Sequence, residues 1–276
     1  MRTWRISRGL FVLGGALLLI LAVQVPVYGQ HQSLNSWGGN FYGQLGLVTP
    51  QFPQQVPGLT AVRADEDGDL HALVIKNDGT LWAWGSNVNG QVGTGAGAMI
   101  PSPVQVGTNT NWTEVACGLR FSMAIRSDGT LWGWGMNNHG QLGDGTTTQR
   151  TSPVQVGTGT SWSAVACGAY HTIALQTDGS LWSWGHNADG QLGLGTTVSQ
   201  NSPTQVGSQT NWASVSCGGA YSHAIKTDGT LWGWGYNGFG QLGDGTNTQR
   251  SSPVQIGSAT WAVMTSGNGH ALALRT

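Results

Sequence analysis

The chain has 276 residues, of which 45 are glycine, 14 are tryptophan and only 8% are charged. This composition favours short strands joined by tight turns over helices, and its aromatic content excludes a disordered chain. The 11 Lys and Arg residues against 12 Asp and Glu form no basic run, which opposes nucleic-acid binding.

Residues 1–29 have the layout of a secretory signal peptide. Three arginines are followed by a run without polar side chains from Gly9 to Val23, and small residues then lead to Gly29. We expect cleavage before Gln30, although an uncleaved anchor is the alternative. Without this segment the chain has 8 basic and 12 acidic residues, a net charge of −4. The mature protein is expected to be secreted, periplasmic or on the cell surface, and not bound to a membrane.

A ten-residue segment that begins Trp-Gly-x-Asn occurs five times and dominates the sequence. The copies start 47 residues apart once and then 50 residues apart three times. They are Trp37–Gly46, Trp84–Gly93, Trp134–Gly143, Trp184–Gly193 and Trp234–Gly243. A fixed period of this size indicates an array of one supersecondary unit.

The third copy shows one complete unit of about 50 residues. Residues 162–167 and 171–176 form the first two predicted strands, and the Asp-Gly turn at 178–179 leads to a third at 180–184. A long connection follows, and residues 203–206 form an outer strand. We therefore predict an all-β fold, a β-propeller of about five four-stranded blades.

The two chain ends supply different parts of one unit. Ser33–Gly38 matches the third strand, whereas 261–264 and 270–275 match the first and second strands. Joining them completes a fifth blade and removes two free sheet edges. We predict a single domain at 30–276, a monomer whose last blade is closed by N- and C-terminal strands. A modular piece that pairs with further repeats is the alternative.

The repeated frame Asp-Gly-Thr-Leu-Trp-x-Trp-Gly-x-Asn-x-x-Gly-Gln-Leu-Gly, preceded by Val-Ala-Cys-Gly-x-x-His-Thr-x-Ala-Leu, resembles the regulator of chromosome condensation repeat. The resemblance covers residues 33–276. It implies a β-propeller, although the family usually has seven blades and this chain has five repeats. The founding members are guanine-nucleotide exchange factors that bind chromatin, which the signal segment and the acidic charge oppose. Exported relatives, similar to secreted β-lactamase inhibitor proteins, bind a partner protein through one face.

Several polar residues recur and are expected to be structural. The asparagine of each Trp-Gly-x-Asn turn is expected to bond nearby backbone. One strand position holds His71, His171 and His270 but Phe121 and Tyr221 in the other copies, which indicates a packing slot. Three cysteines lie 50 residues apart, at equivalent positions of adjacent units. We predict that they form no disulfide; they are Cys117, Cys167 and Cys217.

An acidic run, Asp65-Glu-Asp-Gly-Asp69, distinguishes the first unit. We interpret it as a loop that is three residues longer than in the second, third and fourth units. Its oxygen ligands resemble part of a calcium loop, so Asp65, Asp67 and Asp69 form a candidate Ca²⁺ site. No bidentate Glu follows, which favours an acidic solvated loop. No other cofactor is expected.

Positions that vary between the copies are the candidate binding residues, since loops tolerate change and carry recognition. They are Tyr42, Arg120, Met136, His139, Tyr170, His186, Asp189, Tyr236 and Phe239. Drift on a tolerant surface is the alternative explanation. No nucleophile elbow or phosphate loop occurs. We predict a non-enzymatic, exported propeller that binds a protein or cell-envelope polymer. The alternatives are an exchange factor like the founding members, and a hydrolase or lyase at the axial channel.

Overall fold

A computed structural model describes residues 6–13, 16–23, 33–36, 44, 54–60, 62–67, 70–95 and 97–276. All regular elements in these ranges are strands. The first four are β1 (Ile6–Leu13), β2 (Ala16–Val23), β3 (Ser33–Ser36) and β4 (Gln54–Thr60). Four units of four strands follow. The first complete blade has β5 (Val62–Asp67), β6 (His71–Lys76), β7 (Leu81–Gly85) and β8 (Ile100–Gln105), and the second has β9 (Trp112–Cys117), β10 (Phe121–Arg126), β11 (Leu131–Gly135) and β12 (Arg150–Gln155). The third has β13 (Trp162–Cys167), β14 (His171–Gln176), β15 (Leu181–Gly185) and β16 (Gln200–Gln205). The fourth has β17 (Trp212–Cys217), β18 (Tyr221–Lys226), β19 (Thr230–Gly235) and β20 (Arg250–Ser266). The last strand is β21 (Ala271–Arg275).

Each unit folds into one antiparallel sheet with its strands in sequence order, which confirms the predicted blade. In the sheet β13–β16, β14 lies between β13 and β15, and β16 forms the outer edge. The turn between β14 and β15 needs a glycine because Gly179 has φ +80°. Its absent Cβ would also lie 2.2 Å from the Thr210 carbonyl oxygen.

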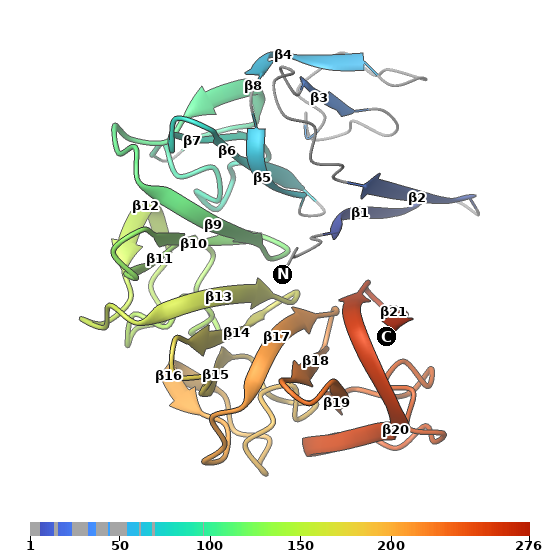
Figure 1. Ribbon diagram of the computed structural model, residues 1–276. Helices are drawn as coiled ribbons and strands as arrows, with labels where there is room; N and C mark the ends of the chain where they lie inside the picture. Colours follow the sequence, from blue (N-terminus) through green and yellow to red (C-terminus); the bar gives the residue numbers. More distant parts are fainter. Residues whose placement is uncertain are drawn as a thin grey trace.

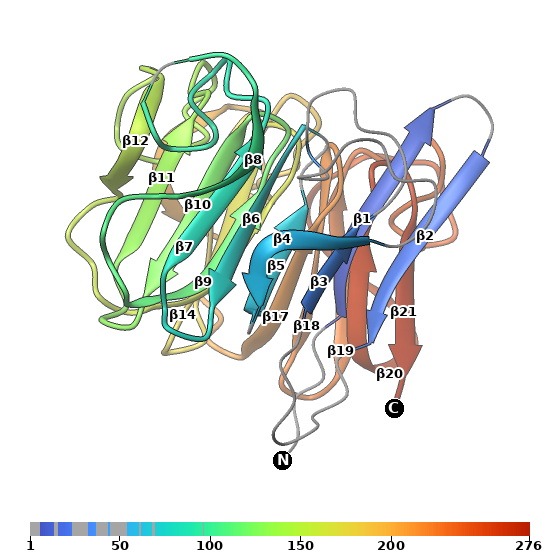
Figure 2. The ribbon, with the colours of Figure 1, turned by 90° about the horizontal axis from the view of Figure 1, so that it is seen from above.

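The blades are arranged around an axis with their first strands innermost (Figure 1). The neighbouring first strands β5, β9, β13 and β17 contact one another in turn. Figure 2 shows the same sheets standing side by side. The fold is therefore an all-β propeller of four-stranded blades, as the sequence predicts.

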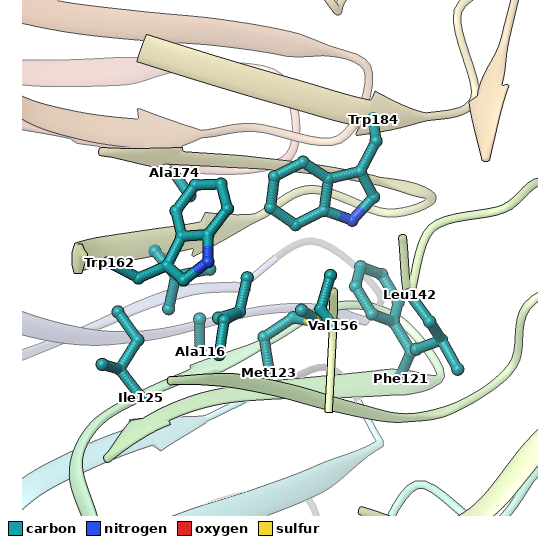
Figure 3. Packing of buried hydrophobic residues seen from close by; sticks show 11 residues of the cluster. Ala116, Phe121, Met123, Ile125, Leu142, Val156, Trp162, Ala174 and Trp184 are labelled. Carbon is teal, nitrogen blue, oxygen red and sulfur yellow. The ribbon is translucent and has the colours of Figure 1, made fainter. Parts of the chain in front are cut away.

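Apolar side chains fill the space between blades. Figure 3 shows the cluster between the second and third complete blades, where Met123 and Leu142 face Trp184. The indole Nε1–H of Trp184 donates to the Gln141 carbonyl at 2.9 Å, so a polar bond joins the blades within the apolar layer. Equivalent bonds link Trp134 to Gln91 and Trp234 to Gln191. In these three blades the second tryptophan of the Trp-x-Trp pair thus belongs to the core and also links neighbouring blades.

The two ends form the half-blades that the sequence predicts. Strand β20 continues from the fourth complete blade into an inner strand and pairs with β21, whereas β3 pairs with β4. Asn35 opposes Gln55 as Trp82 opposes Gln105, so β3 and β4 are a third and a fourth strand in register. In the described strand pairs, however, β3 and β21 are not joined. The N-terminal hairpin of β1 and β2 lies between them in Figure 1.

That hairpin comes from the segment predicted as a signal peptide. Strands β1 and β2 pair from Ile6 opposite Val23 to Leu13 opposite Ala16. The predicted cleavage point after Gly29 lies outside the described residues. Helices long and apolar enough to cross a membrane are absent from the described ranges.

Candidate binding face

The variable positions gather at one end of the blades, where each third strand leaves the sheet. The backbone N–H of Met136 donates to the Arg120 carbonyl at 2.9 Å. His186 makes the same bond to Tyr170. This register places the loop after the first strand beside the Trp-Gly turn of the same blade. We call this surface the recognition face and define it by Arg120, Met136, His139, Tyr170, His186, Asp189, Tyr236 and Phe239.

A buried polar layer holds the turns that carry these residues. The Asn187 side chain accepts the Leu192 N–H at 3.0 Å and donates to the Thr196 and Val198 carbonyls. Asn87, Asn137 and Asn237 accept the equivalent N–H groups at 3.0 Å. The repeated asparagines are therefore structural, as predicted. They leave the outward side chains of the turn free to vary.

Three rings from two blades meet on the recognition face. The ring of His139 lies 4.6 Å from that of His186 and 5.4 Å from that of Tyr170, measured between ring centroids. Both contacts are edge-to-face, and all three residues are half-buried. Burial lowers the pKa of His139, and the nearby charge of His186 lowers it further. The cluster is an amphipathic surface that spans a blade boundary.

A buried glutamine fixes the tautomer of His186. The Gln191 Oε1 accepts the backbone N–H of Asp189 at 2.9 Å, so its Nε2 amide must donate. That amide lies 3.0 Å from His186 Nδ1, which therefore accepts. In the neutral ring the proton is then on Nε2. The sequence did not predict this bond, because the repeated glutamine indicated only a turn residue.

The fourth complete blade adds a second aromatic pair. Tyr236 and Phe239 contact each other with ring centroids 5.8 Å apart. The Tyr236 ring covers Gly238, where an added Cβ would lie 2.3 Å from the tyrosine oxygen. Phe239 is 78% exposed, so most of its ring faces solvent. The two clusters thus place apolar area on neighbouring blades.

The remaining candidate residues are less closely grouped. Arg120 is exposed, whereas Met136 and Asp189 are half-buried. Tyr42 lies outside the described residues. The role of these positions in binding stays a prediction.

The first three residues of the acidic run, 65–67, are the end of strand β5, which corrects the prediction of a longer loop. Asp65 opposes Val74 and Asp67 opposes Ala72 in β5–β6. These are the register positions of Val115 and Cys117 in the next blade. Acidic residues therefore replace apolar ones, and the loop that follows has the ordinary length. Asp69 and the side chains of β5 lie outside the described part, so calcium binding stays a prediction.

The buried histidines occupy the predicted packing slot. His171 Nε2 lies 2.9 Å from Ser222 Oγ, and that hydroxyl donates to the Gln191 carbonyl at 2.9 Å. The imidazole must therefore donate, so it cannot take the serine proton as a catalytic base would. His171 and Ser222 are both fully buried, and burial lowers the pKa of His171 to about 3. The pair is a cross-blade link.

The cysteines also link blades and form no disulfide. Cys167 Sγ lies 3.8 Å from the Ala116 carbonyl, and Cys217 Sγ lies 3.5 Å from that of Ala166. All three cysteines are free thiols. Burial raises the pKa of Cys217 to about 12, which disfavours the reactive thiolate.

Known proteins with related sequences cover part of this chain. A Protein RCC2 homolog from Xenopus laevis is 38% identical over 96 residues, which is 32% of this chain and 18% of that protein. The human E3 ubiquitin-protein ligase HERC2 is 30% identical over 121 residues, 38% of this chain and 2% of that protein. The chain thus spans less than a fifth of these curated relatives.

Solved structures show the same fold over most of the chain. Human WBSCR16 matches with a TM-score of 0.82 and 23% identity over 94% of this chain and 69% of its own. Prp20p from Saccharomyces cerevisiae matches with a TM-score of 0.76 and 20% identity over 85% of this chain and 61% of its own.

The family model of the RCC1-like domain matches residues 27–274, which is nearly the whole chain. The chain therefore belongs to the RCC1-like domain family.

Proposed function

We propose that this chain is an exported, non-enzymatic propeller that binds a partner protein through the recognition face. The observation that carries the proposal is the aromatic surface across neighbouring blades, with His139, Tyr170 and His186 in contact and Phe239 78% exposed. Tyrosine and phenylalanine are enriched where protein interfaces bury most of their area. The polar layer beneath these residues provides a rigid support.

Export is supported by the basic start and apolar run of residues 1–29. The same fold is found in the ectodomain of the Arabidopsis thaliana receptor kinase ACR4, which matches with a TM-score of 0.52 and 17% identity over 87% of this chain and 67% of its own. Intact mass of the protein recovered outside the cytoplasm tests this part. A mature start at Gln30 supports export, and full-length protein in the cytoplasm contradicts it.

An exchange-factor role is the second candidate because of the relatives. The Prp20p structure is described with its binding to Gsp1p and histones, and a second one shows the yeast protein bound to Kap60. Those partners belong to that protein. The net charge of −4 after residue 29 disfavours a nucleic-acid partner here.

A crosslinking capture experiment tests the binding face. The chain is used as bait with the envelope and secreted fractions of its host, and captured proteins are identified by mass spectrometry. We expect one saturable partner whose capture falls at least about tenfold in Tyr170→Ala and Phe239→Ala, as for residues central to an interface. Leu274→Ala is the matched control, because Leu274 is also an exposed apolar side chain (62%) but lies in β21, outside the recognition face.

Equal capture by all four proteins would contradict the recognition face. Capture of a cell-envelope polymer and no protein would contradict the proposed protein partner and would identify the polymer as the ligand.

A further inference from the structure

Two tryptophans form a corner at the other end of each of three blades. One begins the first strand and the other lies in the third strand of the same sheet. Trp112 and Trp132 have ring centroids 6.2 Å apart and planes at 80°. Trp212 and Trp232 repeat this geometry at 6.0 Å and 81°. In such a corner both rings can face the same cation.

The second and fourth complete blades fill the corner with their own basic side chain. The guanidinium carbon of Arg126 lies 4.4 Å from the Trp112 centroid and 3.8 Å from that of Trp132. In the fourth blade the ammonium of Lys226 lies 4.8 Å and 3.9 Å from its two rings. The residue opposite the first-strand tryptophan thus supplies the cation in both blades.

The third complete blade has the same corner without a cation. Trp162 and Trp182 lie 6.1 Å apart at 77°. Trp162 packs into the cluster of Figure 3, which fixes its ring. The residue opposite Trp162 is Gln176, which is half-buried and neutral. The corner therefore keeps its shape but lacks the charge that occupies it elsewhere.

A carboxylate beside this corner also lacks the basic neighbour found in the other blades. Asp178 accepts from the Ser180 hydroxyl at 2.6 Å, and the same hydroxyl accepts the Trp182 indole N–H at 2.9 Å. In the second blade, hydrogen bonds from Thr130 lower the pKa of Asp128, and the charge of Arg126 lowers it further. For Asp178 only the hydrogen bonds from Ser180 and the backbone lower the pKa.

We propose that the corner of Trp162 and Trp182, with Asp178 beside it, binds an external guanidinium or alkylammonium group. Two perpendicular ring faces and one carboxylate provide the attraction, and Gln176 can be displaced because it carries no charge. The site lies at the opposite end of β14 from His171 and Tyr170, so it is separate from the recognition face.

The corner can be probed with small cations by NMR of the ¹⁵N-labelled full chain. The indole N–H signals of Trp162 and Trp182 are assigned from Trp162→Phe and Trp182→Phe. Methylguanidinium and butylammonium chloride are added against sodium chloride at equal ionic strength. We expect saturable shifts of these two signals with the organic cations only.

Two reciprocal variants provide the matched controls. Gln176→Arg gives the third blade the side chain of the second, and we expect at least about tenfold weaker binding of the added cation. Arg126→Gln should create a second responsive corner at Trp112 and Trp132. Shifts equal to those in sodium chloride, or unchanged in Gln176→Arg, would overturn the proposal.

A last arm distinguishes the source of the cation. A capped Gly-Arg-Gly peptide that binds more tightly than methylguanidinium indicates an arginine of a protein, whereas equal binding indicates a free small cation. This experiment does not measure partner capture by the recognition face. The cation site and the recognition face can therefore be contradicted independently of each other.

Discussion

In the Trp-Gly turns, asparagine recurs in every copy at the buried position, whereas the exposed side chain next to it differs. In the second complete blade Asn137 is buried and bonds the backbone of its turn, whereas the adjacent Asn138 is exposed. The first of these two positions is Asn in all five copies, and the second is Phe41, Val88, Ala188 or Gly238 in the other four. The comparison indicates that the fold depends on the inner layer, so the outer layer can change its chemistry at little cost in stability.

Replacing the buried and the exposed asparagine one at a time is the most direct test of this difference. Asn137→Ala removes the acceptor of the Leu142 N–H and the donor to the Thr146 and Thr148 carbonyls. Unpaired buried groups cost about 1–3 kcal/mol each. We expect the free energy of unfolding, measured by urea titration, to fall by about 3–5 kcal/mol.

The matched control is the neighbouring residue. Asn138→Ala should change the same free energy by less than about 0.5–1 kcal/mol, because Asn138 is exposed and its oxygen lies 3.5 Å from the Gln141 amide. Similar losses in both variants would show that the inner layer is not the support of the turn.

The sequence predicts the inner layer better than the outer one, for a physical reason. Repetition shows which residues each blade needs, so the strands, the Asp-Gly turns and the role of the asparagines follow from the sequence alone. The cluster of His139 with Tyr170 and His186 crosses a blade boundary, and no periodicity reports which outward side chains touch. The acidic run was predicted wrongly from its charge. Its acidic residues favoured a loop, but those at 65–67 pair with β6 and continue the strand.

A second prediction concerns the histidine slot of the inner layer. Burial lowers the pKa of both His71 and His171 from 6.5 to about 3. Between these values the unfolded chain binds protons that the folded chain excludes, so stability decreases as pH falls from 6.5 towards 3. His171→Phe should make this decrease shallower by about 1.4 kcal/mol per pH unit, measured by urea titration between pH 6.5 and 4.

The phenylalanine variant has a natural precedent, since Phe121 occupies the same slot in the second complete blade and is fully buried. Thr172 takes the place of Ser222 beside that slot, and its hydroxyl donates to the Gln141 carbonyl although the slot holds no histidine. His71→Phe should have the same effect as His171→Phe. An unchanged pH dependence in both variants would mean that the imidazoles are protonated in the folded state.

The smallest effect is expected on the outer layer. Phe239 is 78% exposed and contacts Tyr236, so Phe239→Ala removes little buried area. Surface substitutions of this kind change stability by less than about 0.5 kcal/mol. We expect an unchanged urea midpoint together with the loss of partner capture. A loss of stability comparable to that of Asn137→Ala would make Phe239 part of the structural layer, and its effect on capture would then report unfolding.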